Sequence, residues 1–571
     1  MKRFIKWLAV IFVIIFVFIF FVYLVIDALL DTEPYVSSNS YLEMTISGDI
    51  PEYEPHDALE DYIRGRALDF RKIRESLKMA QADERIKGIV MHIGFVRSGF
   101  GKLQELQQLI RKFQLSGKKI IAHLDYGMPR DYYLASACDS VFLSPGGNLF
   151  MTGLAGEISF YKGFLEKIGV EADFEHVGEY KNAPDTYTRQ SMSDYQRKVV
   201  NAIFDARFES LVSTISTNRK IDPDSVRYFI ENISIFTPEE ALASKLIDGI
   251  KYREELDRQF EDNDELSAAV SASDYASIDP SSAGLKEKER MAVVYCSGTI
   301  TDGEDGSDPY FGQTVGADRL IRDLKRAAES ASIKAIILRI DSPGGSSLAA
   351  DKIWYAVKEA AKKKPLVASI SDLGASGGYY IAAAADTILA QDLSLVGSIG
   401  VFIGKFSLKG LYQKLDINNE LIKRGKNAAV FSLNSKFTDS ERQIIRRVIT
   451  DFYRKFVSMV AERRKKTYNE IDHIARGRVW DGQQGVKIDL IDLSGGMDEA
   501  VDIAKKLAGI ADDSGIHLVY YPRSRSLLGR YLSSISIVDR LNKNPLHMLE
   551  NFLRGLNMQP LALMPFRIEP E

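Results

Sequence analysis

The chain contains one stretch of sequence twice, and this duplication restricts the fold more than any other feature. Residues 68–93 align with residues 315–340 at an offset of 247. At the same offset, residues 125–139 (DYGMPRDYYLASACD) align with residues 372–386 (DLGASGGYYIAAAAD). A Leu-Ile-Asp triplet near the end of each copy recurs at an offset of 244. Because these matches keep their order along the chain, we predict two copies of one domain.

Each copy has the same succession of predicted elements. In the second copy, an amphipathic helix is followed by a β-branched strand (Ala335–Ile340) and by a helix from about Ser347 to Lys363. Another strand (Pro365–Ile370) then leads into a Gly-rich turn and an Ala-rich helix. Strands that alternate with helices predict α/β layers with mostly parallel strands.

The repeat and the composition together set the predicted domain boundaries. The chain of 571 residues has room for two large domains. We place the first domain at residues 38–257 and the second at residues 289–510. A polar stretch over 258–288 is predicted to link them, and residues 511–571 form a tail with Arg-rich and apolar patches. That tail is predicted either to pack on a neighbouring subunit or to touch the membrane, and the sequence does not decide between these two possibilities.

The first 30 residues predict a membrane anchor. An unbroken apolar run from Trp7 to Ile26 is long enough to cross a bilayer as one helix, and no clear signal-peptide cleavage site follows it. Basic residues precede the run and acidic residues follow it. The positive-inside rule therefore predicts a single-pass protein of the cell inner membrane, with its amino terminus in the cytoplasm and its body in the periplasm or otherwise outside.

The overall composition excludes several classes of function. A net charge of −4 gives no electrostatic support for a nucleic-acid partner. The two cysteines, Cys138 and Cys296, cannot form a disulfide framework, and we read both as buried thiols. No Cys/His spacing typical of zinc sites is present. None of the seven histidines lies close in sequence to a candidate nucleophile.

Two loops of the second copy carry candidate chemistry. Residues 341–346 (DSPGGS) follow a predicted strand, and their paired glycines would let backbone amides approach a ligand, as in an oxyanion hole. Taken alone, this segment also fits an ordinary strand-to-helix turn. Ser376 lies between small residues on the next such turn, near a helix amino terminus that favours negative charge. Serine is also a common helix cap, which is the alternative interpretation.

The first copy serves as an internal control for these loops. Pro129 stands where Ser376 stands, and Arg130 and Asp131 replace the glycines that follow it. Residues 94–98 (GFVRS) stand where the paired-glycine segment stands. A shared helix cap would have no reason to differ in both loops at once, so the asymmetry favours chemistry in the second copy.

A nucleophilic serine needs a base, and lysine is the natural candidate here because no histidine lies in a comparable place. Burial can lower the pKa of a lysine towards neutrality. Two lysines are related by the repeat, Lys181 in residues 177–183 (VGEYKNA) and Lys426 in residues 423–428 (KRGKNA). The physical chemistry of the sequence does not decide between them.

These segments resemble a known family, signal peptide peptidase A or protease IV, in its long tandem-domain form. The resemblance extends from the anchor to about residue 510. It rests on residues 341–345 (DSPGG), 374–380 (GASGGYY), 396–401 (VGSIGV) and 178–181 (GEYK). One departure is Val396, where threonine would be more usual.

The resemblance implies a Ser/Lys dyad on a fold similar to crotonases and Clp proteases. Its serine would be Ser376 and its general base Lys181, given by the first copy, whose segment fits the family better than that of Lys426. Ser398 would orient the lysine. The amides of Gly344 or Gly345, together with that of Gly377, would hold the oxyanion. Cleaved signal peptides are the implied substrates, in a homotetramer that needs no metal or cofactor.

Two other functions remain open at this point. A membrane-bound crotonase-like enzyme acting on acyl-CoA would share the paired-glycine amides, but it would not need Ser376. A non-catalytic assembly scaffold would explain the tandem copies, and the first copy already fits that description. The intact Ser376, Gly344 and Gly345 speak against a scaffold role for the whole chain.

Overall fold

The computed structural model describes residues 34–54, 68–261, 268–308, 312–523 and 561–564, and residues 7, 14, 17 and 18. Within these ranges, no helix combines the length and apolar character that crossing a bilayer would require. The predicted anchor, Trp7–Ile26, lies outside the described residues except for four positions.

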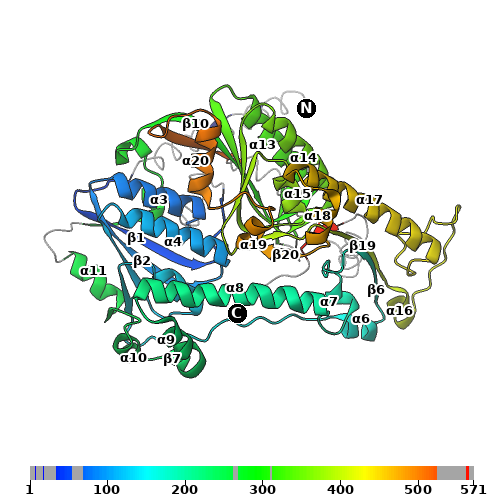
Figure 1. Ribbon diagram of the computed structural model, residues 1–571, viewed down its shortest axis with the longest axis horizontal. Helices are drawn as coiled ribbons and strands as arrows, with labels where there is room; N and C mark the ends of the chain where they lie inside the picture. Colours follow the sequence, from blue (N-terminus) through cyan, green and yellow to red (C-terminus); the bar gives the residue numbers. More distant parts are fainter. Residues whose placement is uncertain are drawn as a thin grey trace.

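The first copy is built on a six-stranded sheet in which every neighbouring pair is parallel, with the strand order β8-β4-β3-β2-β1-β9. Figure 1 shows this copy in blue and green on the left. Its elements are β1 (Ser40–Gly48), α3 (Phe70–Ala82), β2 (Ile86–Val96), α4 (Phe100–Gln114), β3 (Lys119–Leu124), α5 (Pro129–Ala135), β4 (Ser140–Leu143), β5 (Leu149–Phe150), α9 (Pro223–Tyr228), β7 (Ile235–Phe236), α10 (Pro238–Ala243), β8 (Gly249–Ile250), α11 (Arg253–Glu261), β9 (Ala268–Ser271) and α12 (Ala272–Tyr275).

The second copy has a corresponding sheet in the order β20-β18-β16-β14-β10-β22; in addition, β17 pairs with β16, and β21 pairs with β17. All its pairs are parallel except β18 with β20. Its elements are β10 (Glu287–Ser297), β11 (Thr299–Thr301), β12 (Gly306–Asp308), β13 (Gly312–Gly316), α13 (Ala317–Glu329), β14 (Ile333–Ser342), β15 (Gly344–Ser346), α14 (Ser347–Ala361), β16 (Leu366–Ala375), α15 (Gly377–Ala382), β17 (Thr387–Ala390), β18 (Leu395–Gly397), β19 (Val401–Ser407), α16 (Lys409–Lys414), α17 (Asp439–Arg464), α18 (Tyr468–Ile474), β20 (Val479–Asp481), α19 (Gly482–Lys487), β21 (Leu493–Ser494), α20 (Met497–Leu507) and β22 (Gly515–Tyr521).

Helices cover both faces of the second sheet, which explains why its strands read as continuous apolar runs. On one face, α13 and α14 pack against β14 and β16 around side chains such as Leu324, Ile353 and Ile336. On the other face, α20 contributes Met497 and Val501 to a separate apolar cluster. The predicted alternation of strands and helices in layers is therefore present in both copies.

Strands β9 and β22 lie outside the predicted domain limits and extend the two main sheets. Strand β9 falls inside the predicted linker (258–288), yet it pairs with β1 at the edge of the first sheet. Strand β22 falls inside the predicted tail (511–571), yet it pairs with β10 over seven register positions. Each added strand supplies backbone partners to an edge that would otherwise present unpaired amides and carbonyls. Both sheets therefore extend further along the chain than the repeat indicated.

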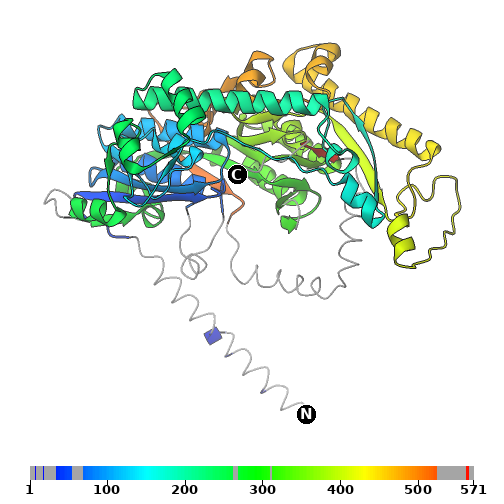
Figure 2. The same ribbon diagram turned by 90° about the horizontal axis from the view of Figure 1, so that it is seen from below.

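A crossing arm, residues 151–219, carries part of the first copy onto the second. It contains α6 (Lys162–Ile168), β6 (Glu171–Val177), α7 (Asp185–Thr188) and the 26-residue helix α8 (Asp194–Arg219). Figures 1 and 2 show α8 running from α7, beside the second copy, back to the first copy. Strand β6 pairs antiparallel with β19 of the second copy over seven residues.

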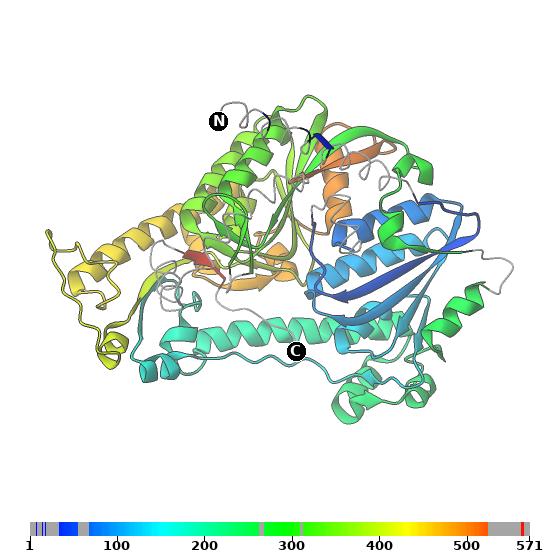
Figure 3. The ribbon, with the colours of Figure 1, turned by 180° about the vertical axis from the view of Figure 1, so that it is seen from behind.

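This pairing belongs to a third sheet with the order β12-β13-β11-β15-β23-β19-β6. Its member β23 (Leu561–Leu563) comes from the far carboxy-terminal part of the chain. Figure 3 shows this short strand in red between the second sheet and the crossing arm. The third sheet thus joins three distant parts of the sequence beside the loop that contains the paired glycines.

Candidate active site

Ser376 lies at the turn between β16 and α15, in a backbone conformation that is rare for a residue with a side chain (φ 55°, ψ −113°). Its amide donates to the Gly397 carbonyl at 2.8 Å, which fixes the turn. The side chain makes no capping hydrogen bond to α15. This geometry does not support the alternative interpretation of Ser376 as a helix cap, and strain of this kind is common at functional sites.

Lys181 of the first copy reaches this serine. Its Nζ atom lies 2.8 Å from Ser376 Oγ, 3.0 Å from Ser398 Oγ and 3.1 Å from the Ser398 carbonyl oxygen. All three residues are fully buried in the chain as described. A neutral amine has two N–H donors and one lone pair. These contacts therefore fit an amine that donates twice to Ser398 and accepts from the Ser376 hydroxyl.

Burial lowers the pKa of the Lys181 amine well below its ordinary value, and no charged group contributes to this shift. The physical cause is desolvation, which penalises the ammonium form, and no carboxylate of the described residues opposes this shift. A lysine of this kind can act as a proton acceptor at a lower pH than a solvated lysine.

The backbone around Lys181 is fixed by close packing against the second copy. The amide of Tyr180 donates to the Arg476 carbonyl at 3.0 Å. A Cβ atom on Gly477 would come within 2.5 Å of the Lys181 backbone nitrogen, and one on Gly400 within 3.1 Å of its Cδ. These two glycines therefore leave the space through which the lysine side chain passes.

Ser398 sits in the loop between β18 and β19, also with a positive φ (49°). Its amide donates to the Arg478 carbonyl at 2.7 Å. The residue thus presents both its hydroxyl and its carbonyl oxygen to one amine. Because β19 pairs with β6, the same strand pair brings Ser398 and the lysine segment together.

The paired glycines line the other side of the site. Gly344 and Gly345 form β15, and a Cβ on Gly345 would come within 2.0 Å of the Ile300 carbonyl oxygen. The Gly344 amide donates to Ser342 Oγ at 3.2 Å. Gly377 opens helix α15, and a Cβ on the next residue, Gly378, would lie 2.7 Å from the Ser342 carbonyl oxygen. The two loops can approach this closely because Gly378 has no side chain at its contact with Ser342.

Lys426, the other lysine offered by the repeat, lies elsewhere. It is exposed in the loop between α16 and α17. Figure 1 shows this part of the chain at the far right, at the end of α17 that points away from the two sheets. The single chain therefore brings Lys181 to Ser376 and leaves Lys426 at the surface.

The carboxy-terminal strand β23 lies along the edge of β15, the strand that contains the paired glycines. It pairs antiparallel with β15, with Leu563 opposite Gly344 and Leu561 opposite Ser346. The Met564 amide donates to the Pro343 carbonyl at 2.8 Å. An extended segment thus adds to the edge of β15 by backbone hydrogen bonding, as a bound peptide would.

Two apolar clusters flank this strand. The Leu561 side chain packs against the cluster around Val170, Phe406 and Leu408. The Met564 side chain packs against the cluster around Leu395 and Val479. Neither the strand nor these clusters was predicted from the sequence. Residues 561–564 (LALM) are apolar, but they carry no pattern that identifies an edge partner.

The sequence matches the model for peptidase family S49 in two segments, residues 112–267 and residues 358–511. Together these segments cover more than half of the chain. They fall in the first and the second copy respectively, so the duplication is visible in the family match as well.

Named relatives share most of the chain. The chain is 32% identical to "Serine protease SPPA, chloroplastic" of Arabidopsis thaliana, over 90% of this chain and 76% of that protein. It is 29% identical to "Protease 4" of Salmonella typhi, over 81% of this chain and 75% of that protein. Among solved structures, a ClpP1 mutant from Listeria monocytogenes matches 37% of this chain and 94% of its own, with a TM-score of 0.24 and 14% identity. That last likeness is too distant to bear on the fold.

Proposed function

This chain belongs to peptidase family S49 and is a serine peptidase, and from this premise we propose that Ser376 is its nucleophile and Lys181 its general base. The family membership predicted from the sequence is confirmed by these matches. The observation that carries the proposed assignment is the 2.8 Å contact between Lys181 Nζ and Ser376 Oγ inside a fully buried site.

In the proposed reaction, neutral Lys181 accepts the Ser376 proton while Oγ attacks a peptide carbonyl carbon. The negative charge that develops on the carbonyl oxygen is held by backbone amides of the glycine loops, drawn from Gly344, Gly345 and Gly377. The leaving amine takes the proton from Lys181. Water, deprotonated in turn by the same lysine, then hydrolyses the acyl-enzyme and regenerates the Ser376 hydroxyl. Ser398 holds the amine in place throughout.

The proposed substrate is an extended apolar peptide that adds to β15 as an antiparallel strand. The way β23 pairs with β15 supports this docking mode, and its apolar flanking clusters support apolar side chains in the substrate. Cleaved signal peptides meet this description. Because β23 covers the same edge, a substrate must displace residues 561–564 before it can bind.

The location and assembly remain part of the proposal. We propose that Trp7–Ile26 anchors the chain in the inner membrane with its body outside the cytoplasm, that each copy has a fold akin to crotonases and Clp proteases, and that four chains assemble. The apolar run and its flanking charges support the anchor. The second copy's counterpart of the crossing arm, residues 398–464, exposes Lys426 in the loop between α16 and α17, and this exposed loop supports contact between chains.

Three variants test the dyad directly. We expect S376A and K181A to lower kcat for an apolar peptide by at least about 10⁴-fold, because each removes a member of a unit that acts together. K426A is the matched control and should retain wild-type kcat. Ser376 in the wild type should be labelled by a serine-directed acylating probe, and Ser376 that escapes labelling would favour the crotonase-like reading. A fully active K181A enzyme would overturn the assignment of the base.

The pH dependence of the reaction provides a second test. Because burial lowers the pKa of Lys181, the amine is neutral only above that lowered value. We expect kcat to fall as pH drops through this pKa and to reach a plateau above it, well below pH 10. A kcat that keeps rising towards the ordinary lysine range would contradict a desolvated lysine base.

A further inference from the structure

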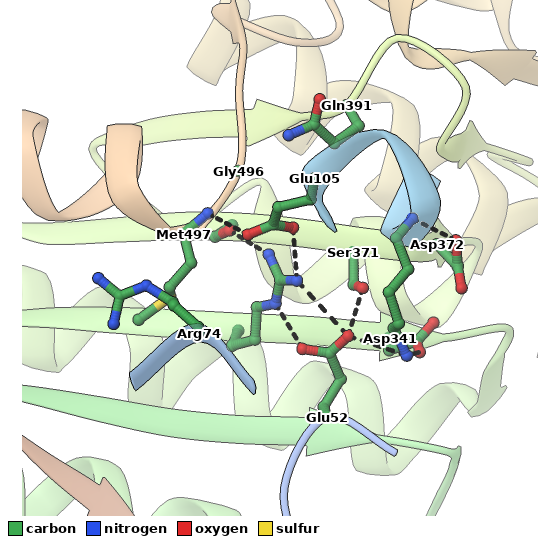
Figure 4. A network of polar contacts seen from close by, with 12 residues as sticks. Glu52, Arg74, Glu105, Asp341, Ser371, Asp372, Gln391, Gly496 and Met497 are labelled. Atoms are coloured by element: carbon green, nitrogen blue, oxygen red, sulfur yellow. Dashed lines mark hydrogen bonds and ion pairs between the residues drawn. The ribbon is translucent and has the colours of Figure 1, made fainter. Parts of the chain in front are cut away.

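The two copies meet at a buried network of charged side chains, shown in Figure 4. At its centre is Arg339 of β14, which is 1% exposed. Arg339 Nε donates to Glu52 Oε2 at 2.7 Å, and its Nη2 donates to Glu105 Oε2 at 2.7 Å. Both carboxylates come from the first copy. Among the described residues, both ion pairs of this guanidinium therefore cross the boundary between the copies, while its Nη1 donates to Ser369 Oγ of its own copy at 2.8 Å.

Lys102, on helix α4 of the first copy, extends this network to the glycine loop. Its Nζ donates to the Ile50 carbonyl at 2.7 Å and lies 3.0 Å from Glu52 Oε1. The same Nζ lies 3.4 Å from Asp341 Oδ2. Asp341 directly precedes Ser342, whose carbonyl oxygen packs against Gly378 and whose hydroxyl accepts the Gly344 amide.

The network also reaches the strand that ends at Ser376. Ser371 Oγ donates to Glu52 Oε1. The neighbouring Asp372 accepts the backbone amides of Gly99 and Lys102, each at 2.8 Å. Asp372 therefore caps the amino terminus of α4, which has no side-chain cap of its own. The helix that carries Lys102 is thus attached to β16 a few residues before the nucleophile.

Lys102 is the cation that most strongly offsets the negative charge around Asp341. Burial, together with nearby Asp372 and Glu52, raises the pKa of Asp341 to about 6, although Lys102 and Arg339 act to lower it. Burial alone would also raise the pKa of Glu52, but Arg339 and Lys102 outweigh it and lower that pKa to about 2. Removing the Lys102 charge would leave Asp341 facing two carboxylates with only the more distant Arg339 to offset them.

We propose that Lys102 is a positioning residue for peptide hydrolysis: by holding Asp341 and Glu52 together, it fixes the glycine loop relative to the strand that presents Ser376. This inference rests on the proposed function, because it assumes that Ser376 is the nucleophile and that the glycine loops hold the oxyanion. The copy without a nucleophile then makes a second contribution to the reaction, one that acts through the second copy's own loops.

The test measures kcat and KM per labelled Ser376 in the full-length protein. K102M keeps the length of the side chain and removes its charge. We expect kcat per labelled site to fall about tenfold, since small displacements of a catalytic group cost one to two orders of magnitude, with KM within about twofold of wild type. A purely structural role would lower the labelled fraction or the melting temperature while leaving kcat per labelled site at the wild-type value.

Lys112 provides a matched control on the same helix. Its Nζ also crosses to the second copy, where it lies 3.0 Å from carboxylate oxygens of Asp498 and Glu499. Those partners belong to α20 and not to either catalytic loop. We expect K112M to keep wild-type kcat per labelled site, so an equal loss in K102M and K112M would overturn the proposal.

The double variant K102M/D341N gives a second measurement that does not depend on K102M folding well. It removes the cation and one of the carboxylates that the cation holds, so the repulsion within the network is relieved. We expect kcat per labelled site to recover to within about threefold of wild type. A double variant that is no more active than K102M would overturn the proposal. Wild-type protein that is not labelled at Ser376 would instead overturn the proposed function itself.

Discussion

The space between two loops is filled differently in the two copies. These loops follow β2 and β3 in the first copy, and β14 and β16 in the second. In the first copy, the Asp131 carboxylate accepts the amides of Phe95 at 3.0 Å, Val96 at 2.8 Å and Met128 at 3.1 Å. The repeat places Gly378 at the position of Asp131 in the second copy. There the two loops touch directly: the nearest described atoms to an added Cβ on Gly378 belong to Ser342 and not to a carboxylate. The first copy thus keeps loop amides that bind an anion, but it supplies the anion from its own chain.

The long arms differ in the same way. Helices α8 and α17 each have 26 residues and follow corresponding parts of the repeat. The first arm crosses to the second copy and buries Lys181 there, whereas the second arm extends outward and leaves Lys426 exposed. Figure 3 shows the two helices pointing to different sides of the second sheet. One duplicated element therefore completes a site within the chain, and the other presents a lysine to the surroundings.

The most demanding test of the difference between the copies is to place a serine at position 129 of the first copy. We expect S376A to lower kcat by at least about 10⁴-fold and P129S/S376A to restore none of it. Asp131 fills the anion site of the first copy, and the lysine of that copy, Lys181, lies beside Ser376 instead. Peptide hydrolysis and labelling by the acylating probe measure the outcome. Labelling at position 129 would mean that the first copy retains a functional site.

The position of Lys181 beside Ser376 of the second copy depends on the space that Gly477 leaves. In G477A, the added Cβ would meet the Lys181 backbone nitrogen at 2.5 Å, so we expect the lysine to move and kcat to fall about 10²-fold. G117A is the matched control, because Gly117 has the same φ of 81° but no atom within 4 Å of the added Cβ. Both variants carry the same backbone strain. Equal losses in the two would show that strain, and not contact with Lys181, is the cause.

The Asp131 carboxylate of the first copy should matter for stability and not for catalysis. D131A would leave the amides of Phe95, Val96 and Met128 without their acceptor. We expect the free energy of unfolding to fall by about 1–3 kcal/mol, as for other buried donors that lose a partner. The midpoint of urea unfolding measures this loss, while kcat should stay at the wild-type value. A large loss of kcat at unchanged stability would contradict a structural role.

The smallest expected effect concerns the strand that covers β15. Deleting residues 561–571 removes β23, which a substrate must otherwise displace, so we expect KM for an apolar peptide to fall a few-fold with kcat unchanged. Deleting only residues 565–571 keeps the strand and should leave KM as in the wild type. Steady-state kinetics at several peptide concentrations separate the two. A higher KM in the longer deletion would show that residues 561–564 help to bind substrate.

Much of the fold could be read from local pattern. The strands expected over 335–340 and 365–370 are the middle of β14 and the start of β16, and the helix expected from Ser347 begins at that residue. The two copies and the α/β layers follow from repetition and from the alternation of apolar runs. Strand β9 was missed because four residues are too few to show a strand pattern. Strand β22 (GIHLVYY) does contain β-branched and aromatic residues, but it lies beyond the end of the repeat that set the domain limit.

The charged network offered one signal that could have been used. Arg339 stands in the apolar run Ile336–Ile340, where burying an unpaired charge would cost much free energy. The sequence therefore indicates a buried acidic partner for Arg339. It could not say which acid, because Glu52 and Glu105 lie more than two hundred residues away in the chain. The partners of such a group are chosen by packing and not by spacing.

By itself, the sequence determined that the chain is duplicated, that the second copy alone carries the serine and the paired glycines, and that two lysines are related by the repeat. Only the tertiary structure decided which lysine meets Ser376. Lys181 and Lys426 occupy equivalent positions in the repeat, so the physical chemistry of the sequence does not distinguish them, although the family resemblance favoured the segment of Lys181. The difference arises because β6 pairs with β19 and carries Lys181 into a buried site between Gly400 and Gly477. Burial then changes the chemistry of that amine, since desolvation lowers its pKa.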